Sequence, residues 1–246
     1  MHVGLNDFDD DSTTADPKVI AFYDALDGSG DDGSGETEPY DDQGHGSHCA
    51  GISSGTGSIG DKPVGSGETP YRGVAPGSSL VGVKVLDSGG SGSFSEVMKG
   101  MEWTIDNQQK YNIRAASMSL GGVWLVELTQ EQEERITHLA NEMVAAGISL
   151  MIAAGNSGGY GTIGTPGAAK DVITVGSTED SKELAVYSSK GPTHEGQIKP
   201  NVAAIGSAVM SVEANSGNGY ASYSGTSMAT PMVAGMAALL LQANPD

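Results

Sequence analysis

The chain has 246 residues, with 12 basic against 31 acidic side chains, so its formal net charge at pH 7 is −19. This length suffices for one domain with a full hydrophobic core. The negative charge argues against nucleic acid or an anionic lipid surface as a partner, because both attract basic surfaces. No apolar run approaches the length of a membrane-spanning helix, so we expect no membrane partner either.

Predicted strands and helices alternate along the chain. Apolar runs rich in β-branched residues predict strands at 18–22, 80–86, 115–120, 149–154 and 172–175. Two capping boxes, Ser93 with Glu96 and Thr129 with Gln132, predict the starts of two helices. A further helix is expected with Pro231 in its first turn, and its residues 232–241 are apolar on nearly every side and so should lie buried. The alternation predicts one α/β domain over residues 1–246: a three-layer sandwich with a mostly parallel sheet and helices on both faces.

Two stretches are acidic: 7–11, which is mostly aspartate, and 27–36, which combines carboxylates with flexible glycine and serine. Oxygen-rich loops of this kind can wrap calcium. A solvated acidic loop is the simpler interpretation, because neither stretch completes a ligand pattern. Structural calcium stays an alternative, and we expect the chemistry to require no cofactor.

A serine near the end of the sequence lies where a loop meets a predicted helix. The sequence Gly-Thr-Ser-Met-Ala-Thr-Pro at 225–231 leads into that helix. Pro231 is expected in the first turn of the helix, where the missing N–H of proline has little cost. Ser227 could be an ordinary helix N-cap. At this position its hydroxyl could also point into a cleft, where backbone N–H groups and the helix dipole favour a developing negative charge.

A serine nucleophile needs a base, and all five histidines precede Ser227. This order argues against an α/β-hydrolase, in which the histidine follows the serine. His45 lies in Gly-His-Gly-Ser-His-Cys-Ala-Gly at 44–51, where glycines on both sides leave the imidazole accessible. His45 and His48 could share a zinc ion on one helix face, but no third ligand and no His-Glu-x-x-His pattern accompany them.

An asparagine follows a predicted buried strand. The sequence Ala-Ala-Gly-Asn-Ser-Gly at 153–158 places Asn156 at the carboxyl end of that strand, where an amide can donate to an oxyanion. On its own, an ordinary turn asparagine is the better interpretation.

Together these three sequences resemble the later signatures of the subtilisin family of serine peptidases (peptidase S8), in the family's order and at about its spacing. The similarity extends along nearly the whole chain and includes 71–86, 90–92, 118–121 and 187–192. The sequence of the segment just before His45 is most similar to that of archaeal subtilases.

The resemblance implies a role for each matched residue. His45 would be the general base and Ser227 the nucleophile, while Asn156 and the Ser227 N–H would hold the oxyanion. Cys49 would be a structural thiol behind the histidine.

Substrate contacts are also implied by the resemblance. A strand edge for extended peptide would be offered by Gly90, Ser91 and Gly92. The two walls of the primary specificity pocket would be formed by Ser119, Leu120, Gly121 and by Ala153, Ala154, Gly155. The protein would be a secreted, extracellular endopeptidase of broad specificity with an apolar preference before the cleaved bond. It would act on protein or peptide substrates and be made with its own propeptide.

The family's catalytic Asp is expected before the histidine, and no Asp-Ser/Thr-Gly motif occurs there. The motif at 87–89 follows the histidine, so we interpret it as a decoy. The segment at 2–5 resembles residues just after the acid. We therefore expect a fragment truncated at both ends, with the Asp, the first strand and any secretion signal upstream of Met1. The alternative to an enzyme is an inactive subtilase-like binding protein. This alternative is favoured only if the full-length protein also lacks the catalytic Asp.

Overall fold

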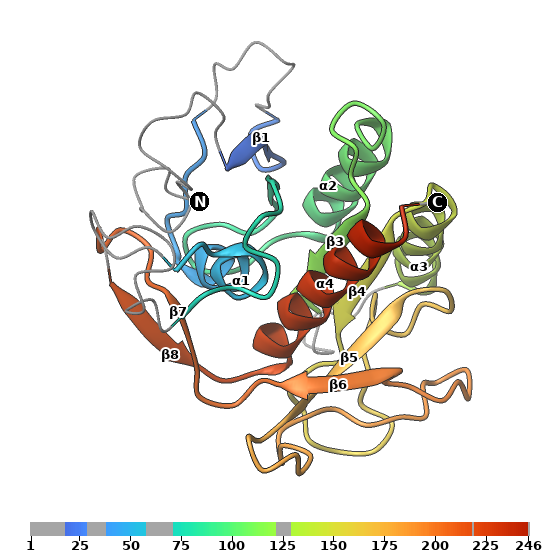
Figure 1. Ribbon diagram of the computed structural model, residues 1–246. Helices are drawn as coiled ribbons and strands as arrows, with labels where there is room; N and C mark the ends of the chain where they lie inside the picture. The colour runs from blue at the N-terminus through green and yellow to red at the C-terminus, as the bar shows by residue number, and fades with distance from the viewer. Residues whose placement is uncertain (1–17, 29–37, 58–70, 122–128, 218, 246) are drawn as a thin grey trace. The chain divides into compact units, whose positions relative to one another are not determined.

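The computed structural model describes residues 18–28, 38–57, 71–121, 129–217 and 219–245, and Figure 1 labels its helices and strands. The chain divides into two compact units. The first comprises the residues up to Ile113 together with Met210–Ala221, and the second comprises Arg114–Val209 and Ser222–Asp246. The expectation of a single domain over 1–246 stays a prediction.

The first unit contains a parallel pair of strands covered by a helix. Strand β1 (Val19–Asp24) pairs with β2 (Leu80–Lys84), and α2 (Phe94–Asp106) packs against both. The predicted capping box at the start of α2 is present: Ser93 accepts a hydrogen bond from the Glu96 backbone, and the Glu96 carboxylate accepts one from the Ser93 backbone. This local signal therefore gave the correct helix start.

Helix α1 (His45–Ser54) lies close to strand β7 (Val209–Val212), which pairs with β8 (Tyr220–Tyr223). Ala50 and Val212 are buried together. A Cβ at Gly51 would lie 2.3 Å from the Ser211 hydroxyl, so only glycine permits this approach.

The second unit contains a four-stranded parallel sheet in the order β3-β4-β5-β6. Its strands are β3 (Ala115–Met118), β4 (Ser149–Ala153), β5 (Ile173–Thr178) and β6 (Val202–Ile205). Parallel strands bring their carboxyl ends to one edge of the sheet, and that edge is where ligands bind in α/β proteins.

Helices cover this sheet on both faces. Met151 and Val175 are fully buried against Ala229 and Ala234 of α4 (Thr226–Ala243), which lies along the sheet (Figure 1). Helix α3 (Gln130–Ala145) packs against β4 and starts at the predicted capping box. Residues 150–153 of β4 are all buried, although neighbouring side chains point to opposite faces. The predicted α/β architecture with a mostly parallel sheet is confirmed.

Helix α4 is longer than predicted and corrects the expectation for Pro231. It begins at Thr226, with Gly225 as its N-cap, so Ser227 is the second helical residue rather than the cap. Pro231 is the sixth residue and lies in the second turn, not the first. Among the described helices, α4 alone has the length and hydropathy that would also suit a membrane span. Its packing against β3–β6 is that of a core helix.

Candidate active site

His45 is the first residue of α1, and an aspartate that the sequence reasoning passed over fixes this helix start. Gly44 has a left-handed φ of 104° and no side chain to cap the helix. Asp41 replaces the cap: its Oδ1 accepts from the Gly44 N–H (2.7 Å) and its Oδ2 from the Ser47 N–H (2.8 Å). Burial alone would raise the pKa of Asp41, but these hydrogen bonds outweigh it and lower the pKa to about 2. The sequence signal that could have identified Asp41 as a cap is a carboxylate a few residues before the start of a helix.

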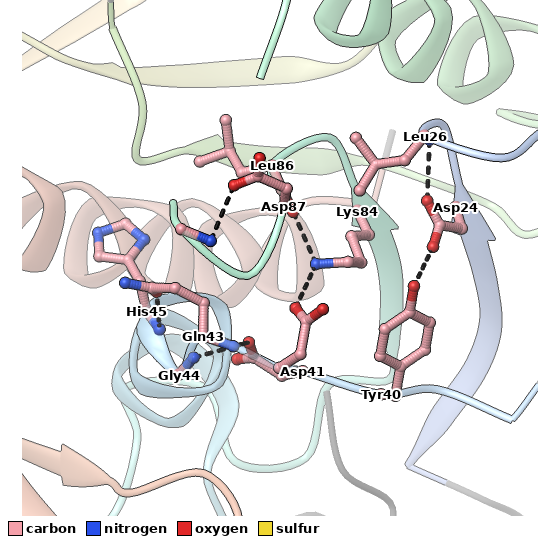
Figure 2. Close-up of polar contacts among 12 residues, drawn as sticks. Asp24, Leu26, Tyr40, Asp41, Gln43, Gly44, His45, Lys84, Leu86 and Asp87 are labelled. Atoms are coloured by element: carbon pink, nitrogen blue, oxygen red, sulfur yellow. Dashed lines mark hydrogen bonds and ion pairs between the residues drawn. The ribbon is translucent and has the colours of Figure 1, made fainter. Parts of the chain in front are cut away.

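The imidazole of His45 is half-buried and suited to accept a proton. Its backbone N–H donates to Gln43 Oε1 (2.8 Å; Figure 2). Its Nε2 lies 3.9 Å from Cys49 Sγ. Burial lowers the pKa of His45 below its usual value, while the charge of Asp41 opposes this shift. A lowered pKa keeps the ring neutral at neutral pH, as a general base requires.

His48 does not join His45 as a metal ligand. Its ring is fully buried, and its Nε2 lies 3.0 Å from the carbonyl oxygen of Ala221. Within the described part of the chain, no group of three or more His, Cys, Asp or Glu side chains could hold a metal ion. The zinc interpretation therefore has no support here. The stretch 7–11 and most of 27–36 lie outside the described residues, so structural calcium stays a prediction.

In the second unit, Ser227 lies at the N-terminal end of α4 and contacts Ser119, just beyond β3. The two residues exchange hydrogen bonds: the Ser227 hydroxyl donates to the Ser119 carbonyl (3.3 Å), and the Ser119 hydroxyl donates to the Ser227 carbonyl (2.7 Å). The nucleophile candidate is thus held beside one predicted pocket wall. Ser227 is partly exposed, whereas Thr226 and Met228 on either side are buried.

The second of these hydrogen bonds explains how α4 tolerates Pro231. In an α-helix the N–H of residue 231 would donate to the carbonyl of residue 227, and proline has no N–H. The Ser119 hydroxyl donates to that carbonyl instead. Ser119 therefore stabilises the turn that carries Ser227 as well as lining the predicted pocket.

Asn156 is placed by its carbonyl oxygen, which leaves its amide nitrogen for another partner. Its Oδ1 accepts from the Thr226 N–H (2.9 Å) and from the Thr226 hydroxyl (3.0 Å). The preceding Gly155 has a left-handed φ of 103°, and a Cβ there would lie 2.9 Å from the Ser189 hydroxyl. The two side-chain N–H groups of Asn156 are donors of the kind an oxyanion needs. Sequence reasoning did not identify Thr226 as the group that orients this amide.

The predicted pocket walls in this unit follow neighbouring parallel strands. Met118 of β3 is in register with Ile152 of β4, so 119–121 and 153–155 lie at the carboxyl ends of adjacent strands. The Gly155 N–H donates to the Thr226 hydroxyl (3.2 Å), which links the second wall to the start of α4. The first wall is described as far as Gly121, and residues 122–128 lie outside the described part.

The first unit places the predicted substrate edge and the decoy motif in one loop. Gly90, Ser91 and Gly92 are exposed just before the N-cap of α2. Asp87 lies in the turn that precedes them, and its carboxylate accepts from backbone N–H groups of its own loop. These contacts agree with its interpretation as a residue other than the catalytic acid.

The chain is similar in sequence and in structure to known proteins. The subtilase family profile (peptidase S8) matches residues 6–246. The chain is 43% identical to serine protease AprX of Bacillus subtilis (strain 168), over 93% of this chain and 54% of that protein. It is 39% identical to subtilisin E of the same organism, over 85% of this chain and 49% of that protein. Among solved structures, sphericase aligns with a TM-score of 0.73 and 32% identity, over 93% of this chain and 72% of that chain.

The chain thus spans about half the length of these two curated relatives. Both are bacterial, and the similarity in style to archaeal members stays a prediction. The profile match includes His45, Asn156 and Ser227, and it covers both units. The chain belongs to the subtilase family.

Proposed function

We propose that the protein is a serine endopeptidase that hydrolyses peptide bonds through an acyl-enzyme. The observation that carries this proposal is the start of α4, where Ser227 follows Thr226, and Thr226 fixes the amide of Asn156. One short segment therefore holds a nucleophile beside an oxyanion donor. Family membership supplies the reaction class.

In the proposed reaction, the Ser227 hydroxyl attacks the scissile carbonyl and His45 accepts its proton. The negative charge that develops on the carbonyl oxygen receives hydrogen bonds from Asn156 and from the backbone N–H of Ser227, at the positive end of the α4 dipole. His45 then donates the proton to the leaving amine, and a water molecule hydrolyses the acyl-enzyme by the reverse roles. Asp41 is not proposed as the acid of a triad, because both of its oxygens cap α1.

The proposal is tested by covalent labelling. A serine-directed phosphonylating reagent should modify Ser227 and no other serine, because only a serine with a base and an oxyanion site reacts at a useful rate. Peptide mapping by mass spectrometry locates the label, and Ser227→Ala should remove it. Inhibition by a zinc chelator such as phenanthroline, without serine labelling, would contradict the proposal and support the zinc interpretation of His45 and His48.

We further propose broad specificity with an apolar preference before the cleaved bond. The walls at 119–121 and 153–155 carry small or uncharged side chains. A library of peptide substrates should show Phe or Leu preferred over Ala at this position by about 10- to 100-fold in kcat/KM, because each buried methylene adds only modest discrimination.

A profile dominated by Arg or Lys would contradict this preference and would indicate a role for Glu133. The Glu133 carboxylate accepts a hydrogen bond from the Thr165 hydroxyl (2.9 Å). Thr165 belongs to a loop in which Gly167 packs closely on the Ala153 carbonyl. Glu133→Gln is the matching variant, and under the apolar proposal it leaves the profile unchanged.

Protein or peptide substrates, an extracellular location and a propeptide are proposed on family membership alone. The alternative of an inactive binding protein is not favoured, because the candidate nucleophile, base and oxyanion donor all lie within the residues that the family profile matches.

A further inference from the structure

The loop between β2 and α2 is shaped mainly by one residue, through both its side chain and its backbone. Asp87 accepts hydrogen bonds at Oδ1 from the N–H groups of Gly89 (2.8 Å) and Ser91 (3.0 Å). Its own N–H donates to the Ser91 carbonyl (2.7 Å), and its carbonyl accepts from the Gly90 N–H (2.9 Å). Both backbone groups of Ser91 are therefore turned inward and bound to Asp87.

This inward bonding determines what the loop presents outward. In an extended backbone, the N–H and C=O of successive residues point to opposite sides. Because Ser91 points toward Asp87, Gly92 points the other way. Within the described part of the chain, no residue hydrogen-bonds to the Gly90 carbonyl or to the backbone N–H and C=O of Gly92. These three groups can pair with an added peptide strand.

The loop is also fixed at its two ends. A Cβ at Gly92 would lie 2.2 Å from the Val85 carbonyl oxygen, so glycine is required for this close approach. The next residue, Ser93, is locked by the capping box of α2. At the other end, the Leu86 carbonyl accepts from Lys84 Nζ (2.6 Å).

Lys84 and Gln43 connect this loop to the segment that carries the base. Lys84 Nζ also binds Asp42 Oδ1 (2.6 Å), and 9% of the Lys84 side chain is exposed. Gln43, which accepts from the His45 N–H, has its Nε2 3.4 Å from the position of a Cβ on Gly90. The loop is thus held against the start of α1.

We propose that Asp87 is a positioning residue for substrate: it holds Gly90 and Gly92 so that they pair with the backbone of an extended peptide. The proposal deepens the proposed peptidase function and rests on it for the identity of the ligand. It assigns a role to the motif at 87–89, which has no part in proton transfer.

Stabilisation of the fold is the competing explanation, and exposure distinguishes the two. All residues from 87 to 92 are exposed, so loss of this turn uncovers no core. The effect of losing Asp87 should therefore appear in peptide binding and depend on how far the peptide extends from the cleaved bond. A residue that only stabilised the fold would affect short and long ligands alike.

The test is a binding measurement on the full chain with Ser227→Ala, so that no peptide is consumed. Two probes are compared by calorimetry: an acetyl-tetrapeptide amide, and an N-acetyl amino acid amide that carries only the last residue of that peptide. Asp87→Ala should raise the dissociation constant of the tetrapeptide about tenfold, because the receiving strand is no longer pre-organised. The single-residue probe should change less than about twofold, because it does not reach Gly90 or Gly92.

Two variants serve as controls. Asp87→Asn keeps an Oδ1 acceptor for both N–H groups, so it should restore tetrapeptide binding to within about twofold of the parent. Asp180→Ala removes an exposed acidic charge elsewhere and should change neither probe. An unchanged tetrapeptide dissociation constant in Asp87→Ala, or an equal loss with both probes, would overturn the inference. Absence of hydrolysis and labelling in the chain with Ser227 intact would instead count against the proposed function, and the binding data would still decide the role of Asp87.

Discussion

Where the catalytic acid expected from the family is present, replacing Ser227 with alanine is expected to abolish peptide hydrolysis, with kcat falling about 10⁶-fold, a magnitude taken from nucleophile removal in subtilisin itself. The physical reason is that the acyl-enzyme cannot form without the hydroxyl. Initial rates with a peptide p-nitroanilide measure the loss. His45→Ala should cost about as much, and the double variant should lose little more than either, because the two residues act as a unit.

A matched control is Ser222→Ala, which removes an exposed hydroxyl from β8. It should retain parental activity. Circular dichroism should show that Ser227→Ala keeps the parental fold, because Ser227 is partly exposed and its carbonyl contact with Ser119 does not need the hydroxyl. Activity of Ser227→Ala within tenfold of the parent would exclude Ser227 as the nucleophile.

Elements with local signals could be predicted from the sequence. The capping boxes at Ser93 and Thr129 satisfy N–H groups of their own helices, so a few adjacent residues determine each helix start. The five predicted strands are all present, with ends displaced by a few residues. Long apolar runs remain recognisable without knowledge of their partners.

Elements that depend on distant partners were missed. Strand β6 has four residues, mostly exposed, and is a strand because it pairs with β5. Strands β7 and β8 are equally short and pair with each other. The start of α4 was misplaced for the same reason. Pro231 suggested a first turn, whereas a hydroxyl more than a hundred residues away, on Ser119, replaces the hydrogen bond that proline cannot make.

The candidate site also contains residues with local sequence signals and residues that depend on distant partners. His45, Asn156 and Ser227 were identified from motifs, because their immediate neighbours carry the signal. Their supporting residues, Asp41 and Thr226, act through hydrogen bonds whose geometry a sequence does not specify. Asp87 belongs with the supporting residues: its motif matches that of the family's acid and was set aside because it follows the histidine, while the hydrogen bonds that its carboxylate accepts within its own loop could not be read from the sequence.

Replacing the Asn156 amide tests whether it stabilises the transition state. Asn156→Ala should lower kcat about 10²- to 10³-fold, a magnitude taken from removal of the corresponding donor in subtilisin itself. KM should change little, because the hydrogen bond strengthens only as negative charge develops on the carbonyl oxygen. Steady-state kinetics with one peptide substrate separate the two parameters.

Asn156→Asp separates the two functions of this side chain, which are to accept hydrogen bonds from Thr226 and to donate hydrogen bonds to the oxyanion. A carboxylate still accepts from the N–H and hydroxyl of Thr226, so the local structure and the melting temperature should be preserved. It has no N–H to donate, and its charge opposes that of the oxyanion, so kcat should fall at least as far as in Asn156→Ala. Asn201→Asp is the matched control, because Asn201 also accepts a backbone N–H, from Thr174, and it should leave kcat unchanged. A kcat of Asn156→Asp within about threefold of the parent would contradict the oxyanion role of Asn156. Its contribution would then lie in its contact with Thr226, and the Ser227 N–H and the α4 dipole would have to stabilise the oxyanion without the Asn156 amide.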